Sequence, residues 1–194
     1  MRDEAIGNNV LYLQNSNELK SYFPLGLDFG SDIKTKLMMA VWQEVAAYMS
    51  NELAKQRNVD KIDLMTLNKV MYFAQRECYV KTYRPLFEEN VFHAAQYGPV
   101  IIKLKRCLKR DELTETPCDD WIREHEDILR YVIAHYGRMS AHTLSSLSHS
   151  EISWRNARDR ACYAKHYQRI SDADIRLDAM KIRIREEKLR RKVV

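Results

Sequence analysis

Apolar side chains recur at helical spacing along most of the chain, and the clearest repeat falls between residues 65 and 82. The apolar residues of this repeat are Leu67, Val70, Met71, Ala74 and Cys78. Positions three or four residues apart lie on one face of an α-helix, so we expect the face formed by these residues to be buried. The pattern therefore predicts a central amphipathic helix.

The polar positions of the same segment predict how this helix begins and which side it exposes. Thr66 is expected to cap the N-terminus, with Met65 and Val70 packed as a hydrophobic staple. The positions outside the apolar stripe are predicted to form a polar or half-polar face: Lys69, Tyr72, Gln75 and Arg76.

Further helices are predicted on both sides of this segment. A long helix is expected from Ile33, capped by Asp32, to about Arg57. A short helix is expected to begin at Pro99, which has no N–H and so suits the first helical position. The others are predicted from about Asp119 to Tyr136, from Ser140, from Trp154 to Ala161 and from Ser171 onward.

Two of these helices have apolar residues whose direction can be predicted. In the helix that follows Ser140, the residues expected to face inward are Thr143, Leu144 and Leu147. In the last helix, the stripe expected to face the core consists of Ala173, Leu177, Met180 and Ile184.

Two short segments are candidates for strands. Residues 10–13 form an apolar run, and residues 91–96 fit either a strand or a turn of helix. With only five glycines and four prolines in 194 residues, the chain is predicted to be mostly α, as a single compact multi-helix domain. We divide it into an N-terminal extension (1–31), a helical domain (32–180) and a basic C-terminal helix or tail (181–194).

The positive charge of the chain is concentrated at its C-terminal end. From Lys181 to Val194, seven basic residues against two acidic ones give a net charge of +5, which equals the excess of the whole chain. A tail of this kind makes nucleic-acid binding the alternative function. The residues that would carry it are Arg183, Arg185, Lys188, Arg190, Arg191 and Lys192. The alternative also includes the basic residues from Lys103 to Arg110, for which a solvated face is the favoured interpretation over a phosphate-binding one.

The chain lacks the patterns of secreted, membrane and zinc proteins. Its four cysteines show no paired CxxC spacing, so no metal site is expected, and they are predicted to be reduced. The N-terminus has no apolar signal core, and no apolar run is long enough for a membrane span. We therefore expect a cytoplasmic protein that does not contact a membrane.

The catalytic motifs that carry a mechanism are absent from the sequence. It contains six histidines but no HExxH, GxSxG or P-loop, so we expect no catalytic residues and no cofactor. His149, Ser150 and Glu151 are adjacent, which does not make a triad. The favoured role of His149 is to bond a backbone carbonyl above Trp154, and the alternative is a hydrolase built on His149. Gln75 is predicted either to bond backbone near Gly98 and Pro99 or to contact a partner.

Short segments spread along the chain resemble a known family. They are Leu67-Asn68-Lys69-Val70-Met71-Tyr72-Phe73-Ala74-Gln75 with the later Pro85-Leu86-Phe87, then Ala95-Gln96-Tyr97-Gly98-Pro99-Val100, and Leu147-Ser148-His149-Ser150-Glu151-Ile152-Ser153-Trp154. In this order they resemble the Panacea antitoxin domain, which includes SocA-like proteolytic adaptors and phage-associated relatives. The resemblance covers about residues 33–180. Asn68 departs from it, because a lysine is expected there.

The resemblance implies an antitoxin of a toxin–antitoxin system that binds and masks a cognate toxin encoded nearby. In SocA-like relatives the toxin is also presented to an ATP-dependent protease. The partner-binding residues that it suggests are Tyr72, Gln75, Arg76, Tyr97, Pro99, His149 and Trp154. For Arg76→Glu we expect weaker toxin binding without unfolding. The sequence does not decide whether the chain self-associates.

Overall fold

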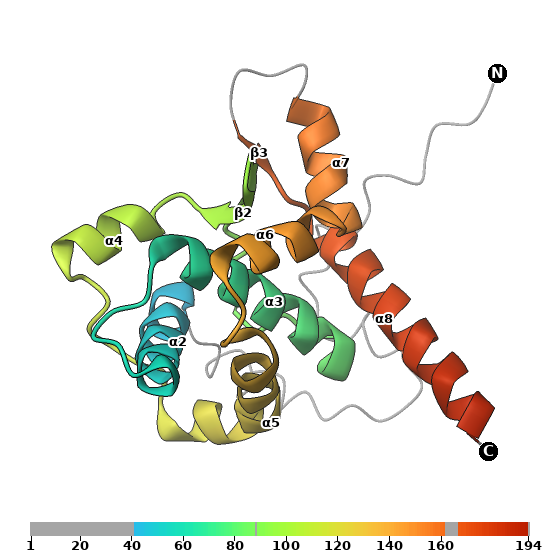
Figure 1. Cartoon of the computed structure of the whole chain (residues 1–194), viewed down its shortest axis with the longest axis horizontal. Coiled ribbons are helices and arrows are strands. Elements are labelled where there is room, and N and C mark those ends of the chain that lie inside the picture. The colour runs from blue at the N-terminus through green and yellow to red at the C-terminus, as the bar shows by residue number, and fades with distance from the viewer. Residues whose placement is uncertain (1–40, 88, 162–166, 194) are drawn as a thin grey trace, which may run out of the picture. The chain divides into compact units, whose positions relative to one another are not determined.

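Helix α3 (Leu64–Thr82) runs through the middle of the structure, and helices α2, α5, α6 and α8 and strand β2 pack against it (Figure 1). The structure is a computed structural model that describes residues 41–87, 89–161 and 167–193, all within one unit that spans Met39 to Val194. The predicted extension at residues 1–31 and the candidate strand at 10–13 lie outside the described residues. The described part is mostly helical, as predicted.

The central helix is buried on every side rather than on one face. Every side chain from Thr66 to Val80 is buried, so the predicted polar face of Lys69, Tyr72, Gln75 and Arg76 lies in the interior instead of in water. That prediction was wrong because neighbouring elements pack around the whole circumference of α3. An amphipathic pattern identifies one buried face but does not show that the opposite face is exposed.

The start of α3 also differs from the prediction. Asp63, not Thr66, is the N-cap, and its carboxylate accepts hydrogen bonds from the Thr66 backbone N–H at 2.8 Å and from the Thr66 hydroxyl at 2.6 Å. Met65 is 37% exposed, so it does not form the predicted staple. Aspartate caps a helix as well as threonine does, and the earlier of the two residues starts the helix here.

A small antiparallel sheet replaces the helix that was predicted at Pro99. Strands β1 (Phe92–Ala95) and β2 (Gly98–Ile101) form a hairpin, and β3 (Gln168–Arg169) pairs with the other edge of β1. Of the two alternatives left open for residues 91–96, the strand is the one observed. The helix prediction was wrong because β2 is an edge strand, where a proline without an N–H is tolerated. Helix α4 (Leu104–Arg110) begins after the strand.

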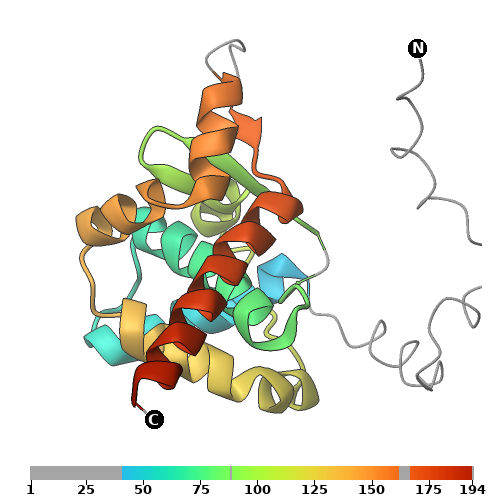
Figure 2. The ribbon, with the colours of Figure 1, turned by 90° about the vertical axis from the view of Figure 1, so that its right-hand side faces the viewer.

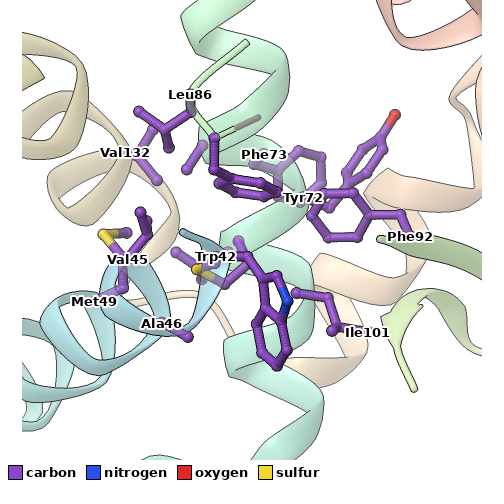
Figure 3. Packing of buried hydrophobic residues seen from close by; sticks show 14 of the residues in the cluster. Trp42, Val45, Ala46, Met49, Tyr72, Phe73, Leu86, Phe92, Ile101 and Val132 are labelled. Carbon is purple, nitrogen blue, oxygen red and sulfur yellow. The ribbon is translucent and has the colours of Figure 1, made fainter. Parts of the chain in front are cut away.

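The helix before α3 is α2 (Trp42–Arg57), which ends at the predicted residue. Its N-cap is Val41, which has an extended backbone, so the predicted helix does not continue through this position. Asp32 and the segment from Ile33 lie outside the described residues. Trp42, Val45 and Met49 project from α2 into the same buried cluster as Tyr72 and Phe73 of α3 (Figure 3).

The predicted helices after α4 are confirmed. They are α5 (Asp119–Tyr136), followed by Gly137, α6 (Ala141–His149), capped by Ser140, and α7 (Ile152–Ala161), which begins two residues before Trp154. In α6 the buried side chains are Leu144, Ser145 and Ser148. The prediction that Thr143 and Leu147 face inward was wrong, since both are exposed. The inward side holds Ser145, which donates to the carbonyl oxygen of Tyr97, and Ser148, which donates to that of Ser145 in the same helix.

The last helix, α8 (Asp172–Val193), continues without a break past residue 180. As predicted, it starts at a capping arrangement of Ser171 and Asp174, with the Asp174 N–H donating to Ser171 Oγ at 3.1 Å and the Ser171 hydroxyl donating to Asp174 at 2.7 Å. The predicted core stripe was wrong: Ile175 and Ala179 are buried, whereas Leu177, Met180 and Ile184 are exposed. Figure 2 shows α8 lying across the outside of the unit.

Candidate functional site

The backbone of the β1–β2 hairpin is held by side chains from three helices. Trp154 Nε1 of α7 donates to the carbonyl oxygen of Ala95 at 2.9 Å, and Ser145 of α6 donates to that of Tyr97 at 2.9 Å. From α3, Lys69 Nζ donates to the carbonyl oxygen of Pro99 at 3.3 Å. Each bond satisfies a backbone acceptor of the hairpin, so the turn is fixed in position.

Asn68 completes this support from α3. Its side-chain oxygen accepts a hydrogen bond from the Ile101 N–H at 2.6 Å, and its amide nitrogen donates to the carbonyl oxygen of Leu64 at 2.8 Å. The residue that departs from the expected lysine therefore bonds both the sheet and its own helix.

Gly98 allows the hairpin to approach α3 and α6 closely. Its φ of +103° is unfavourable for residues with a side chain, and a Cβ there would lie 2.8 Å from Lys69 Cε and would also collide with Ser148 Oγ. Burial lowers the pKa of Lys69 to about 8, although the nearby Asp63 carboxylate opposes this.

The tip of the hairpin is exposed. Gln96 and Tyr97 form the turn, and Tyr97 is 58% exposed. Below it, the rings of His149 and Trp154 stack with their centroids 4.1 Å apart. The tip therefore presents an aromatic ring to solvent from a rigid base.

His149 has the structural surroundings that were expected. Burial lowers its pKa and the charge of Lys69 lowers it further, while a hydrogen bond with the backbone of Gln96 opposes the shift. Burial and the nearby cation therefore both disfavour the protonated imidazole. The adjacent side chains bond elsewhere, since Ser150 donates to the Leu147 carbonyl and Glu151 pairs with Arg76. The three neighbours do not form a catalytic triad.

Arg76 lies at the centre of a buried ion cluster. Its guanidinium pairs with Glu151 at the start of α7 and with Glu77 at 2.6 Å, bonds the Tyr136 hydroxyl at 2.6 Å, and lies over the Phe73 ring. Burial lowers the pKa of Arg76, but the two carboxylates and Tyr136 outweigh it and raise the pKa above its ordinary value. Burial raises the pKa of Glu151 to about 7 despite Arg76.

Tyr72 belongs to a second buried network, next to the first. Its hydroxyl lies 2.6 Å from Ser153 Oγ, and Asp178 of α8 accepts from the backbone N–H groups of Ile152 and Ser153 at 2.7 and 2.9 Å. Asp178 therefore satisfies free donors at the N-terminus of α7. In the sequence, Asp178 lies among apolar positions of α8, and nothing there indicated that it bonds the N-terminus of α7.

Gln75 is a buried amide, which was one of its two predicted roles, but it bonds a different segment. Its side-chain oxygen accepts from the N–H groups of Leu86 and Phe87 at 2.9 and 3.3 Å, not from backbone near Pro99. Lys69 and Asn68 take the role at Pro99 and Ile101.

The candidate partner-binding residues therefore fall into two groups. Tyr72, Gln75, Arg76 and Pro99 are buried and engaged within the chain, whereas Tyr97 is exposed, with His149 and Trp154 half-buried behind it. The residues that support the hairpin could not be identified from the sequence. They are polar residues of α3 and α6, and polar residues on a helix are expected to contact solvent. These residues are Asn68, Lys69 and Ser145.

The residues of the alternative nucleic-acid function lie on α8. Arg183 is half-buried over the Tyr83 ring, 3.3 Å from its centroid. The exposed residues are Arg185, Lys188, Arg190, Arg191 and Lys192. Within the described ranges, no group of histidine, cysteine and acidic residues could hold a metal ion, and no helix is long and apolar enough to span a membrane.

The segments that meet at the hairpin lie within a stretch matched by a known family. Residues 67–155 match the antitoxin SocA-like, Panacea domain. The match confirms the resemblance seen in the sequence for residues 67–155, a shorter stretch than the expected 33–180, and it supports an antitoxin role. No curated protein and no solved structure matches the chain significantly. The Panacea stretch runs from α3 to the start of α7, so α2, β3 and α8 lie outside it.

Proposed function

We propose that the chain is the antitoxin of a toxin–antitoxin pair and neutralises its cognate toxin in the cytoplasm by direct, stoichiometric binding. The observation that carries the proposal is the exposed Tyr97 at the tip of a hairpin whose backbone is held by Lys69, Ser145 and Trp154. All four residues lie in the stretch matched by the Panacea domain of SocA-like antitoxins.

A rigid exposed tyrosine suits a protein interface. Its ring provides a large contact area and loses little rotamer entropy on binding. The bonds to the hairpin backbone fix the tip before the partner arrives, which lowers the entropy cost of association. These properties favour Tyr97 as a direct contact.

The other candidate residues have supporting roles in this proposal. His149 and Trp154 hold the hairpin from below, whereas Tyr72, Gln75, Arg76 and Pro99 stabilise the interior. A stable interface buries about 1,200–2,000 Å² in total, more than one turn provides. The exposed surface of α6, which bonds the hairpin through Ser145, is therefore expected to contribute.

Neutralisation by binding requires surface complementarity and no chemical step. We accordingly propose that the chain is not an enzyme. The toxin is expected to be encoded next to it. Delivery of the toxin to an ATP-dependent protease would add a second effect, because the toxin would then disappear from the cell instead of accumulating in a complex.

Co-expression with the neighbouring open reading frame tests the proposal. We expect the neighbour to arrest growth when expressed alone, the full chain to restore growth, and the two to co-purify in a fixed ratio. A toxin level that falls only in cells with an active protease indicates delivery, whereas a constant level indicates masking. A harmless neighbour, or rescue without any complex or toxin loss, contradicts the proposal.

A further inference from the structure

Helix α8 has a second apolar face, which points away from the rest of the described chain. Leu177, Met180 and Ile184 are 46%, 53% and 48% exposed and follow one another at a spacing of three and four residues. On the opposite side, Ile175 and Ala179 are buried where α8 packs on α3 and α7. Figure 2 shows the length of α8 along the outside of the unit.

A narrow stripe at this spacing is the pattern of a helix–helix seam. Successive positions three and four residues apart form a line along a helix that a second helix can cover. Helices that lie on membranes have a wider apolar face instead. The stripe on α8 is one residue wide.

Cations run beside the stripe. A shallow hollow of about 430 Å³ follows this side of α8, and its lining contains four basic and two apolar residues and no carboxylate. These are Lys181, Ile184, Arg185, Lys188, Leu189 and Lys192. A partner that covers both the stripe and the hollow must combine apolar and acidic residues.

The helix that presents this surface is held firmly at several points. Ser171 and Asp174 cap its start, Asp178 bonds α7, and Arg183 lies over the Tyr83 ring. Because these contacts fix α8 as far as Arg183, the part of the helix that carries the stripe is in place before a partner binds.

We propose that the outward face of α8 docks an acidic amphipathic helix of a partner protein. The surface lies outside the Panacea stretch, so the proposal does not rest on the antitoxin role. The positive charge of the hollow favours an acidic partner over a second copy of the chain. Two copies meeting through the same face would bring cations against cations, which opposes association.

The apolar stripe makes nucleic acid an unsuitable occupant of this surface. Phosphates would pair with Arg185 and Lys188 but would leave Leu177, Met180 and Ile184 in water. An acidic helix with a leucine seam covers the stripe and neutralises the cations at once.

A synthetic peptide provides the test. The probe is a helix of about three heptads with leucine at the seam positions and glutamate on both flanks. We expect it to bind the full chain, with affinity that falls as salt increases. The same peptide with lysine in place of glutamate should not bind.

Two double variants and two controls locate the binding face. Leu177→Ser with Ile184→Ser, and Arg185→Glu with Lys188→Glu, should each weaken peptide binding by about tenfold or more. The controls are Ile102→Ser, at a 52% exposed apolar residue away from α8, and Arg155→Glu, on the exposed side of α7. Both should bind like the wild type, and circular dichroism should show that all variants keep their helices.

Three results would overturn the proposal. They are no binding of the acidic peptide, binding that both double variants retain, and equal binding of the lysine peptide. Anionic lipid vesicles and duplex DNA are tested in parallel. If either binds through this face and the acidic peptide does not, the surface serves that ligand instead.

Discussion

The indole nitrogen of Trp154 donates to the carbonyl oxygen of Ala95 at 2.9 Å, which ties the start of α7 to the last residue of β1. The two residues are 59 positions apart in the chain. Because His149 stacks on the same indole ring, one side chain links the hairpin, α6 and α7. The fixed position of the hairpin tip depends on this link.

Replacing the indole should therefore destabilise the domain measurably. Trp154→Phe removes the only hydrogen-bond donor of the side chain and leaves the Ala95 carbonyl without it. We expect the free energy of unfolding, measured with urea, to fall by about 1–3 kcal/mol. Tyr167→Phe, at a 57% exposed aromatic residue, is the control and should change it by less than about 0.5 kcal/mol. Equal effects of the two substitutions would refute the role given to Trp154.

Gly98 should tolerate no side chain. In Gly98→Ala, the added methyl group meets Lys69 and Ser148 at a backbone φ that disfavours alanine. We expect a loss of about 2–4 kcal/mol in the free energy of unfolding. Gln96→Ala, at the exposed turn two residues earlier, should have little effect. An unchanged unfolding midpoint for Gly98→Ala would mean that the close approach is not needed.

Arg76→Glu is expected to unfold or strongly destabilise the domain, which revises the expectation from sequence that the fold would be spared. The substitution removes the cation that pairs with Glu77 and Glu151 and places a third carboxylate beside them. Breaking a buried pair in this way costs about 3–5 kcal/mol. Arg130→Ala, which removes an exposed pair with Glu126, should cost less than about 1 kcal/mol. Thermal unfolding of both variants checks the difference.

The Glu151 carboxyl should make stability depend on pH. Its pKa is raised from 4.5 to about 7 in the folded state, so the folded protein holds a proton that the unfolded chain has lost in this range. The contribution of Glu151 to stability is therefore largest below about pH 4.5 and is lost as the pH rises through about 7. Glu151→Gln cannot titrate, and its unfolding free energy should fall less than that of the wild type between pH 5 and 7.5 in urea titrations. Parallel pH curves for the two proteins would contradict this assignment.

The periodic pattern predicted the main helices but not their surroundings. It located α3, α5 and α6 because apolar residues at helical spacing form a local signal. It could not show that Lys69 and Arg76 are buried, because their partners Pro99 and Glu151 lie far along the chain. Polar residues enter the interior when distant groups satisfy them, and spacing contains no information about such groups.

The two largest errors have local physical causes. Pro99 fits the start of a helix and an edge strand equally well, and only the pairing of β2 with β1 decides between them. On α8, both faces contain apolar residues, so the sequence could not identify the buried one. Contacts with distant elements determine the core side: Asp178 bonds the start of α7, and α8 packs against α3.

Within the candidate site, the sequence identified the segments but not the division of roles. The segments that resemble the Panacea domain contain Tyr97, His149 and Trp154, which the fold brings together. They also contain Tyr72 and Gln75, which the fold buries. A linear motif does not separate residues that form a surface from those that support it.

The central claim is that Tyr97 contacts the toxin directly, and one affinity comparison tests it. Purified Tyr97→Ala and Tyr167→Ala start from nearly equal exposure, 58% and 57%, and neither should change the unfolding midpoint. In calorimetric titrations with the neighbouring gene product, Tyr97→Ala should weaken binding by about 2 kcal/mol or more, and Tyr167→Ala should bind like the wild type. Wild-type affinity for Tyr97→Ala, or an equal loss in both variants, would contradict the account.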